Sequence, residues 1–273
     1  MDLIINTAHH PDLLLEKTVL RRGGALIDLI ELSDPERSQL DASTATAEGL
    51  VLIHTGLGGV AYLAIADLLR THPGADGGEY GLMFSASGSA GRDGGMFAHR
   101  LLTSFSHHTT ATVPFPEPFG TRRCLEVGGH HTGVPRATVG GAPVRHYLYM
   151  RPPALNLLLL GLNFARLAGA LPSGLFTAGG GKVPEEPSDE PICEWVSVSR
   201  SGTRVASRTI HGRGYYAMTV AATLVFAREL ATRRDPQAAG VKSVEEVFVL
   251  PELAPALEEA GIIVQDQALV AAK

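Results

Sequence analysis

Apolar and polar segments alternate regularly along the first third of the chain. Short runs rich in Leu, Ile and Val occupy residues 2–6, 25–29 and 50–54, and segments with helical periodicity follow at 11–22 and 59–71. Strands that are apolar at nearly every position need cover on both faces, and each intervening segment is long enough for a crossover helix. The pattern therefore predicts parallel strands connected by helices.

Two stretches interrupt or end this pattern. Residues 33–48 are polar with short side chains, which predicts a surface loop. Residues 71–78 are rich in turn-forming residues, and short strands with Pro and Gly punctuation follow them. We therefore expect a Rossmann-like domain over residues 1–75, an α+β domain for substrate binding and dimerisation over 76–212, and C-terminal helices over 213–273 that return to the first domain.

The elements beyond residue 78 are predicted from the same periodicities. They are a strand at 80–85, a helix at 95–105, an apolar helix at 153–171, an antiparallel hairpin of 192–199 and 204–209 around Ser201-Gly202-Thr203, a long helix at 215–232, a strand or short helix within 240–248, and a helix at 252–260 capped by Gly261. The helix at 153–171 is so apolar that we expect it inside its domain or at the subunit interface of a homodimer.

Composition and charge narrow the class of protein. The chain has 273 residues and a formal net charge of −5, and its basic residues are scattered, so a nucleic-acid partner is not expected. The longest apolar run, at 155–160, is too short to span a bilayer, and no secretory signal precedes the first strand. Cys124 and Cys193 form no metal-ligand or redox motif. These features favour a cytoplasmic protein with reduced thiols and no membrane partner.

A glycine-rich turn follows the third predicted strand. The spacing of Gly56, Gly58 and Ala61 matches a dinucleotide-binding turn, in which backbone amides approach a pyrophosphate. Such a site also needs an acidic residue at the end of the next strand to hold a ribose hydroxyl. Here that strand ends in Ser-Ala-Ser-Gly, and Glu79 precedes it. The spacing therefore leaves open whether the glycines bind a cofactor or have a different role.

Histidines are the main candidates for chemistry. His9, His10 and His54 directly follow predicted strands, at the carboxyl ends where open parallel sheets bind ligands. A histidine there can act as a general acid or base near neutral pH, and the alternative is a loop residue that hydrogen-bonds backbone. Adjacent histidines point to opposite faces of a strand, and no carboxylate completes a ligand pattern, so no metal site is expected.

Two other segments offer polar groups for a substrate. Ser87 and Arg92 lie in a small-residue turn before a predicted helix, which could hold an anion or form an ordinary capped loop. Tyr215 and Tyr216 follow a glycine turn, where they could line a pocket or anchor a helix by packing.

Taken in order, several segments resemble the saccharopine dehydrogenase-like oxidoreductases. They are DLIINTAHHPDLLLEKTVLRRGGALIDL, HTGLGGVAYLAIADLL, SASGSAGRDGGMFAH, HGRGYYAMTVAATLVFARELA and AAGVKSVEEVF. The resemblance implies an α/β plus α+β fold, in which an antiparallel-sheet and helix domain is inserted into a Rossmann-like parallel sheet. It also implies that the first segment corresponds to the family's fourth strand, helix and fifth strand, and that the glycine turn faces the substrate.

The same resemblance implies an NAD(P) cofactor, but the family's amino-terminal pyrophosphate loop has no counterpart in this sequence. The Rossmann-like sheet is thus expected to be truncated, and NAD(P) binding is in doubt because helix and loop amides supply much of the phosphate recognition.

Three functions remain open from the sequence. The first is a small-molecule oxidoreductase in which Asn6, Thr7, Gly56 and Gly58 contact NAD(P). The second is a cofactor-independent cyclase, isomerase or lyase of a biosynthetic pathway. There His10, His54 or Tyr216 would transfer protons, and the substrate would contact His9, Ser87, Arg92 and Tyr215. The third is a noncatalytic partner subunit that associates through the helix at 153–171.

Overall fold

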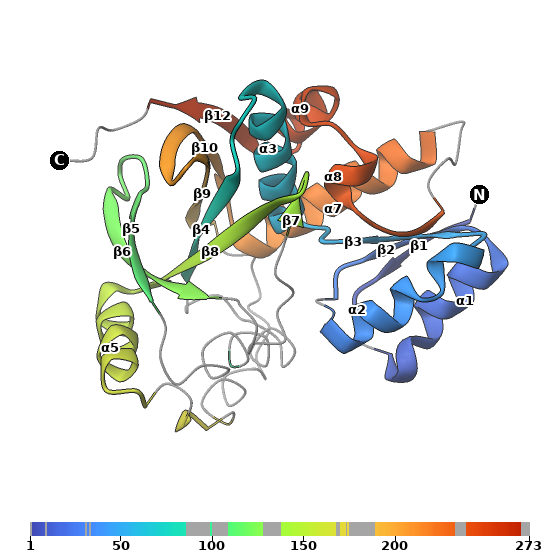
Figure 1. Ribbon diagram of the computed structural model, residues 1–273, viewed down its shortest axis with the longest axis horizontal. Helices are drawn as coiled ribbons and strands as arrows, with labels where there is room; N and C mark the ends of the chain where they lie inside the picture. The colour runs from blue at the N-terminus through green and yellow to red at the C-terminus, as the bar shows by residue number, and fades with distance from the viewer. Residues whose placement is uncertain are drawn as a thin grey trace.

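The protein folds into two β-sheets joined by a shared layer of helices (Figure 1). The computed structural model describes residues 2–8, 10–30, 32, 34–85, 99, 109–127, 138–167, 170–172, 174, 189–232 and 239–268. The helix predicted at 95–105 and the candidate residues His9, Ser87 and Arg92 lie outside these ranges.

The first sheet, termed sheet A, contains the parallel strands predicted from the apolar runs. Its order is β1 (Leu3–Asn6), β2 (Ala25–Asp28), β3 (Leu50–Ile53) and β11 (Gly240–Ser243), and each neighbouring pair is parallel. Every residue of β2 and β3 is buried, as expected for strands that are covered on both faces.

One face of sheet A is covered by α1 (Leu14–Arg22), which follows the short 3₁₀ turn Pro11–Leu13, and by α2 (Asp34–Asp41) (Figure 1). The prediction of a loop at 33–48 was therefore wrong, because this segment contains α2 and a 3₁₀ turn at Thr44–Thr46. Leu40 is fully buried against the core of this face, and it is the apolar position by which the polar helix α2 is anchored. A single apolar residue leaves no periodicity to detect.

The second sheet, termed sheet B, is mixed and strongly curled. Its order is β12 (Ile263–Gln267), β10 (Thr203–Arg213), β9 (Pro191–Arg200), β4 (Gly77–Ser85), β8 (Ala142–Arg151), β6 (Thr121–Val127) and β5 (Thr110–Pro114), with β7 (Thr138–Val139) beside β8. Only β4 and β8 run parallel among the described pairs of this sheet. The predicted hairpin is confirmed as β9 and β10, and both turn residues, Ser201 and Gly202, have positive φ, as a type I′ turn requires.

The helices between the sheets make one continuous core. They are α3 (Leu57–Thr71), α7 (Tyr215–Thr232), α8 (Val244–Val247) and α9 (Leu250–Glu259). α3 packs against β9 and β10 on one side and against α7 and α8 on the other. Ile27 and Leu52 of sheet A share a cluster with Val196 and Ile210 of sheet B, so the two sheets are held by the same buried layer.

The apolar helix expected at 153–171 is observed as α5 (Pro153–Phe164), and it does not pack inside the core. Asn156, Leu159 and Asn163 are its buried residues, whereas Leu157, Leu158 and Phe164 are exposed. The prediction that this helix packs inside its domain was therefore wrong.

Both cysteines are free and buried, as predicted, and burial raises the pKa of each thiol to about 12.

Candidate functional site

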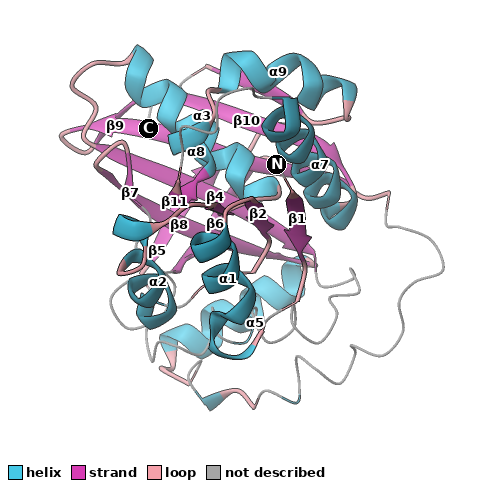
Figure 2. Ribbon diagram, turned by 90° about the vertical axis from the view of Figure 1, so that its right-hand side faces the viewer, coloured by secondary structure: helices cyan, strands magenta, loops and turns pink. Residues whose placement is uncertain are grey.

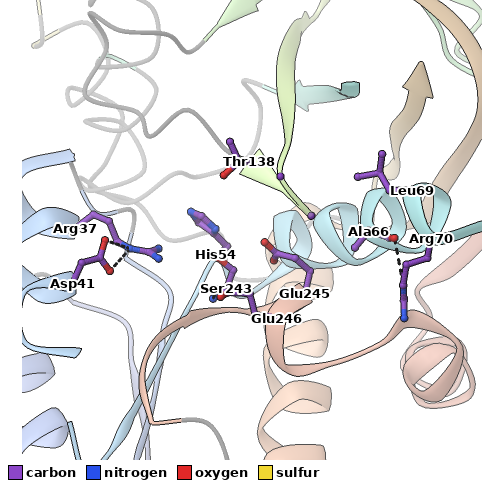
Figure 3. A pocket seen from close by; sticks show the side chains of 12 residues that line it. Arg37, Asp41, His54, Ala66, Leu69, Arg70, Thr138, Ser243, Glu245 and Glu246 are labelled. Atoms are coloured by element: carbon purple, nitrogen blue, oxygen red, sulfur yellow. Dashed lines mark hydrogen bonds and ion pairs between the residues drawn. The ribbon is translucent and has the colours of Figure 1, made fainter. Parts of the chain in front are cut away.

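A cavity of about 750 Å³ opens at the carboxyl ends of β3 and β11, where parallel sheets usually hold ligands. Its walls come from α2, the end of β3, α3, the turn after β7 and the start of α8 (Figure 3). The lining residues are Arg37, Asp41, His54, Ala66, Leu69, Arg70, Thr138, Gly140, Gly141, Ser243, Glu245 and Glu246.

His54 enters this cavity from the residue directly after β3. Its φ is 54°, a left-handed conformation that costs energy for a residue with a β-carbon. The turn from His54 into α3 is tight, because a β-carbon on Gly59 would lie 2.3 Å from the carbonyl oxygen of His54. Burial, with smaller effects of Arg37 and His146, lowers the pKa of His54 to about 4. The imidazole is therefore neutral at pH 7, and its buried Nδ1 has no hydrogen-bond partner among the described residues.

Glu245 enters the same cavity from the first turn of α8. Burial raises its pKa to about 7, and the charge of Glu246 adds to this effect. Hydrogen bonds to its own backbone amide and to the Ser243 side chain, and to a smaller extent the charge of Arg37, oppose the rise. Its buried Oε2 has no partner in the described part of the chain. The next residue, Glu246, differs because it accepts hydrogen bonds from the Ser243 backbone amide at 2.7 Å and from Lys242 Nζ at 3.3 Å. Figure 3 shows the His54 ring and the Glu245 carboxyl directed into the cavity.

Arg37 supplies the positive charge near both groups. Its Nε donates to the two carboxylate oxygens of Asp41 at 2.9 and 3.1 Å, and its terminal nitrogens make no hydrogen bond within the described ranges. The charge of Arg37 lowers the pKa values of both His54 and Glu245. One cavity is thus lined by His54 as a neutral base, by Glu245 as a carboxyl that is half protonated near pH 7, and by the partly free guanidinium of Arg37. Such a set of groups is typical of general acid–base sites.

A chain of polar aromatic residues lies behind His54. The rings of His54 and Tyr62 are 5.0 Å apart and nearly edge to face, and the Tyr62 hydroxyl lies 3.0 Å from Nε2 of His146. Tyr80 packs edge to face against Tyr62 and His146. Burial lowers the pKa of His146 to about 4, so this ring too is neutral. These contacts link His54 to His146 through Tyr62.

Glu194 lies in the same buried region, on β9. Burial raises its pKa to about 8, and the approach of the Tyr80 hydroxyl offsets this only in part. Neither carboxylate oxygen makes a hydrogen bond of normal geometry to the described residues. Glu194 is therefore mostly protonated at pH 7.

Three site residues predicted around the first strand, Asn6, Thr7 and His10, do not line this cavity. Asn6 is buried, and its Nδ2 donates to Glu16 Oε1 at 3.3 Å and to Asp28 Oδ1 at 3.1 Å. Burial raises the pKa of Asp28 to about 7, and the nearby charge of Glu16 adds to this effect. Thr7 and His10 are exposed. The Asn6 side chain is thus already occupied by two buried carboxyl groups, and neither Thr7 nor His10 lines the cavity around His54.

The glycine turn has a packing explanation. Gly56 has a φ of 80°, and a β-carbon on it would lie 2.8 Å from Cγ2 of Thr219 on α7. A β-carbon on Gly58 would meet only the Tyr80 hydroxyl, at 4.0 Å, outside the backbone of its own helix. The amino terminus of α3 therefore closes against α7 at the first glycine, whereas the second glycine, where backbone approaches the pyrophosphate in a dinucleotide-binding turn, has space beside it. Cofactor contact by Gly56 and Gly58 stays a prediction.

Tyr215 and Tyr216 begin α7, with ring centroids 6.0 Å apart and nearly perpendicular. Tyr216 is exposed, and neither tyrosine is among the residues that line the cavity of His54. Of the three predicted catalytic residues, the structure brings only His54 to this cavity.

Sequence reasoning missed the partners of His54. Arg37 and Glu245 lie in segments predicted as a loop and as an undecided strand or helix, and Tyr62 and His146 carry no motif. One usable signal was present at Glu194, because an acid in an otherwise apolar stretch of a predicted strand is unusual in a core.

Within the described residues, no three His, Cys, Asp or Glu side chains gather as a metal-binding group. The same part of the chain contains no helix that is long and apolar enough to cross a membrane.

A parallel sheet with a cavity at its carboxyl edge, joined to a mixed sheet, defines a Rossmann-like α/β protein. No protein-family model and no curated protein sequence matches the chain. Among solved structures, the chain is similar to apo histidine-tagged saccharopine dehydrogenase (L-Glu forming) from Saccharomyces cerevisiae, with a TM-score of 0.51 and 13% sequence identity. The alignment covers 98% of this chain and 85% of that one. The fold is therefore saccharopine dehydrogenase-like.

Proposed function

We propose that this chain is a small-molecule enzyme that works by proton transfer in the cavity of His54 and Glu245. One observation carries the proposal. Two groups that face the same cavity have pKa values displaced in opposite directions, with the histidine at about 4 and the carboxyl at about 7. Environments that separate the pKa values of neighbouring groups in this way are typical of acid–base active sites.

The roles follow from the protonation states. At pH 7 the neutral His54 accepts a proton from the substrate, and protonated Glu245 donates one. Arg37 stabilises negative charge that develops on the substrate, because its terminal nitrogens face the same space. A cyclisation, isomerisation or elimination needs these three roles and no net oxidation. The cavity volume suits a small polar molecule.

The second candidate is an NAD(P)-dependent oxidoreductase, and the saccharopine dehydrogenase-like fold favours it. The strand after the glycine turn ends in Ser-Ala-Ser-Gly, so it lacks the acidic residue that would hold a ribose hydroxyl of the cofactor. We therefore rank this candidate below the acid–base enzyme.

Two measurements separate the candidates. Titration with NADPH to millimolar concentration, followed by cofactor fluorescence, is expected to show no saturable binding. Saturable binding that is lost in Gly58→Asp would favour the oxidoreductase. Compounds that bind the wild type in a ligand-observed NMR screen of small polar metabolites are then incubated with the protein, and products are identified.

For a compound that is converted, His54→Gln and Glu245→Gln are each expected to lower kcat at least ~100-fold. Tyr216→Phe is the matched control, since it changes a predicted catalytic residue outside the cavity, and it should retain the wild-type rate. Loss of activity in Tyr216→Phe with full activity in His54→Gln would overturn the proposal.

A further inference from the structure

The amino terminus of α3 is mostly buried, and it has no cap. Its N-cap residue is Gly56, which has no side chain that could accept a hydrogen bond. The backbone amides of Leu57 and Gly58 make no hydrogen bond to any described residue. Gly56 and Leu57 are buried, whereas Gly58 is partly exposed. Buried amides at the start of a helix need acceptors, and Gly58 is the position that is open to one.

A fully buried carboxyl group is linked to this opening through Tyr80 of β4. The Tyr80 hydroxyl is the group that a β-carbon on Gly58 would meet, at 4.0 Å. Burial is the main cause that raises the pKa of Tyr80, and the charge of Glu194 on β9 is the next. Both carboxyl oxygens of Glu194 are buried and have no hydrogen-bond partner among the described residues. Figure 2 shows α3 against the strands of sheet B, and α3 contacts β9 directly.

Thr219 of α7 brings a further hydroxyl to the same turn. A β-carbon on Gly56 would lie 2.8 Å from Cγ2 of Thr219, so this side chain lies beside the N-cap. Its buried Oγ1 has no partner in the described part of the chain. Two amides and the hydroxyls of Tyr80 and Thr219 thus surround the start of α3, and all of them can donate hydrogen bonds.

We propose that the start of α3 binds the carboxylate group of a small molecule, which accepts hydrogen bonds from the amides of Leu57 and Gly58 and from the Tyr80 hydroxyl. α3 has 15 residues, and a helix of this length carries about half a positive charge at its amino terminus, which favours an anion. The proposal does not rest on the acid–base reaction at His54, and binding alone tests it.

The surrounding charges favour a carboxylate over a phosphate. The main effects on the pKa values of Tyr80 and Glu194 come from burial and from neighbouring tyrosine and carboxyl groups, and none of them comes from Arg or Lys. A phosphate monoester carries a charge of about −1.5 to −2 at pH 7 and is usually bound by such cations. The single charge of a carboxylate matches two amides, a hydroxyl and a helix terminus better.

Glu194 controls the direction in which the Tyr80 hydroxyl donates. Burial raises the pKa of Glu194 to about 8, so its carboxyl group is mostly protonated at pH 7 and mostly ionised at pH 9. The protonated group donates to the Tyr80 oxygen and leaves the Tyr80 proton for the ligand. The ionised group accepts that proton itself, and its charge repels a bound anion. The ligand therefore binds the form in which Glu194 is protonated.

The other ionisable groups around Tyr80 and Glu194 do not titrate between pH 7 and 9. They are His54, Tyr62, His146, Cys193 and Tyr215. Burial places the pKa values of the two histidines at about 4 and that of the thiol at about 12, and phenols ordinarily titrate near pH 10. A change of affinity in this pH range is thus assigned to Glu194.

Titration of the whole chain with sodium acetate, followed by NMR of labelled methyl groups, tests the proposal. At pH 7 the methyl signals of Leu57 and Thr219 should shift saturably with acetate and not with sodium chloride at equal ionic strength. At pH 9 about one tenth of Glu194 remains protonated, so the apparent Kd should rise about tenfold. Glu194→Gln keeps a donor toward Tyr80 and should have the same Kd at both pH values. A wild-type Kd that does not change with pH would overturn the proposal.

Two aspartate variants test the location. Gly58→Asp places a carboxylate of the protein itself at the start of α3 and should abolish acetate binding. Gly202→Asp makes the same change in the turn between β9 and β10, where a β-carbon meets nothing within 4 Å, and it should bind acetate as the wild type does. Unchanged binding in Gly58→Asp, or no saturable shift in the wild type, would contradict the site. Inorganic phosphate that binds more tightly than acetate would contradict the carboxylate class.

Discussion

The hydroxyl oxygen of Tyr62 on α3 lies 3.0 Å from Nε2 of His146 on β8, so a hydrogen bond joins the helix layer to sheet B next to His54. Because the Tyr62 ring also packs against His54, this bond fixes the back wall of the proposed acid–base site.

Removing that bond should cost stability. Tyr62→Phe leaves Nε2 of His146 without its partner, and an unpaired buried polar group costs about 1–3 kcal/mol. The free energy of unfolding in urea should fall by this amount. Tyr216→Phe is the control, because its hydroxyl belongs to an exposed residue, and it should change stability by less than about 0.5 kcal/mol. Equal effects of the two variants would show that the bond contributes nothing.

The two partly buried histidines, His54 and His146, should resist protonation. Their pKa values of about 4 lie below the ordinary value of 6.5, so the unfolded chain binds protons more tightly between these values. Stability contributed by His54 and His146 is thus complete above pH 6.5 and is lost as the pH falls toward 4. In an NMR titration, their ring signals should stay unchanged from pH 8 to 5. His146→Gln should raise the pKa of His54, since His146 is one cause of its shift.

Glu194 should impose the opposite pH dependence. Its pKa of about 8 exceeds the ordinary 4.5, so the folded state binds the proton more tightly. The stabilising effect is complete below pH 4.5 and is lost as the pH rises through 8, with a slope of up to about 1.4 kcal/mol per pH unit for one proton. Denaturant titrations from pH 6 to 9 should show stability falling more steeply in wild type than in Glu194→Gln. Parallel curves would mean that Glu194 is not protonated in the folded protein.

The two glycines of the turn before α3 should respond differently to alanine. Gly56→Ala introduces a strained φ and a contact with Thr219, and should destabilise the protein by about 2–4 kcal/mol. Gly58→Ala places a better helix former in open space, and should leave stability unchanged or raise it by up to about 1 kcal/mol. Thermal unfolding of both variants checks the difference. A large loss in Gly58→Ala would indicate that the second glycine is needed for a reason that the packing does not supply.

Much of the fold follows from local periodicity. The buried strands β2 and β3, the hairpin of β9 and β10, and α7 over Tyr215–Thr232 were all predictable, because each element buries apolar residues at the period of its own backbone. α2 was not predictable, since its helical state depends on one leucine that packs against distant residues. β12 was also missed, because its exposed, mostly polar residues are fixed by pairing with β10.

The candidate site, too, was predictable from the sequence only in part. The position of His54 after an apolar strand was enough to place it at the carboxyl edge of a parallel sheet, since that rule depends only on chain order. Its proximity to Glu245 was decided by the tertiary structure, because β11 pairs with β3 although β4 to β10 lie between them in the sequence. The tertiary structure also decided the shifted pKa values of His54 and Glu245, since burial and neighbouring charges exist only in the folded protein.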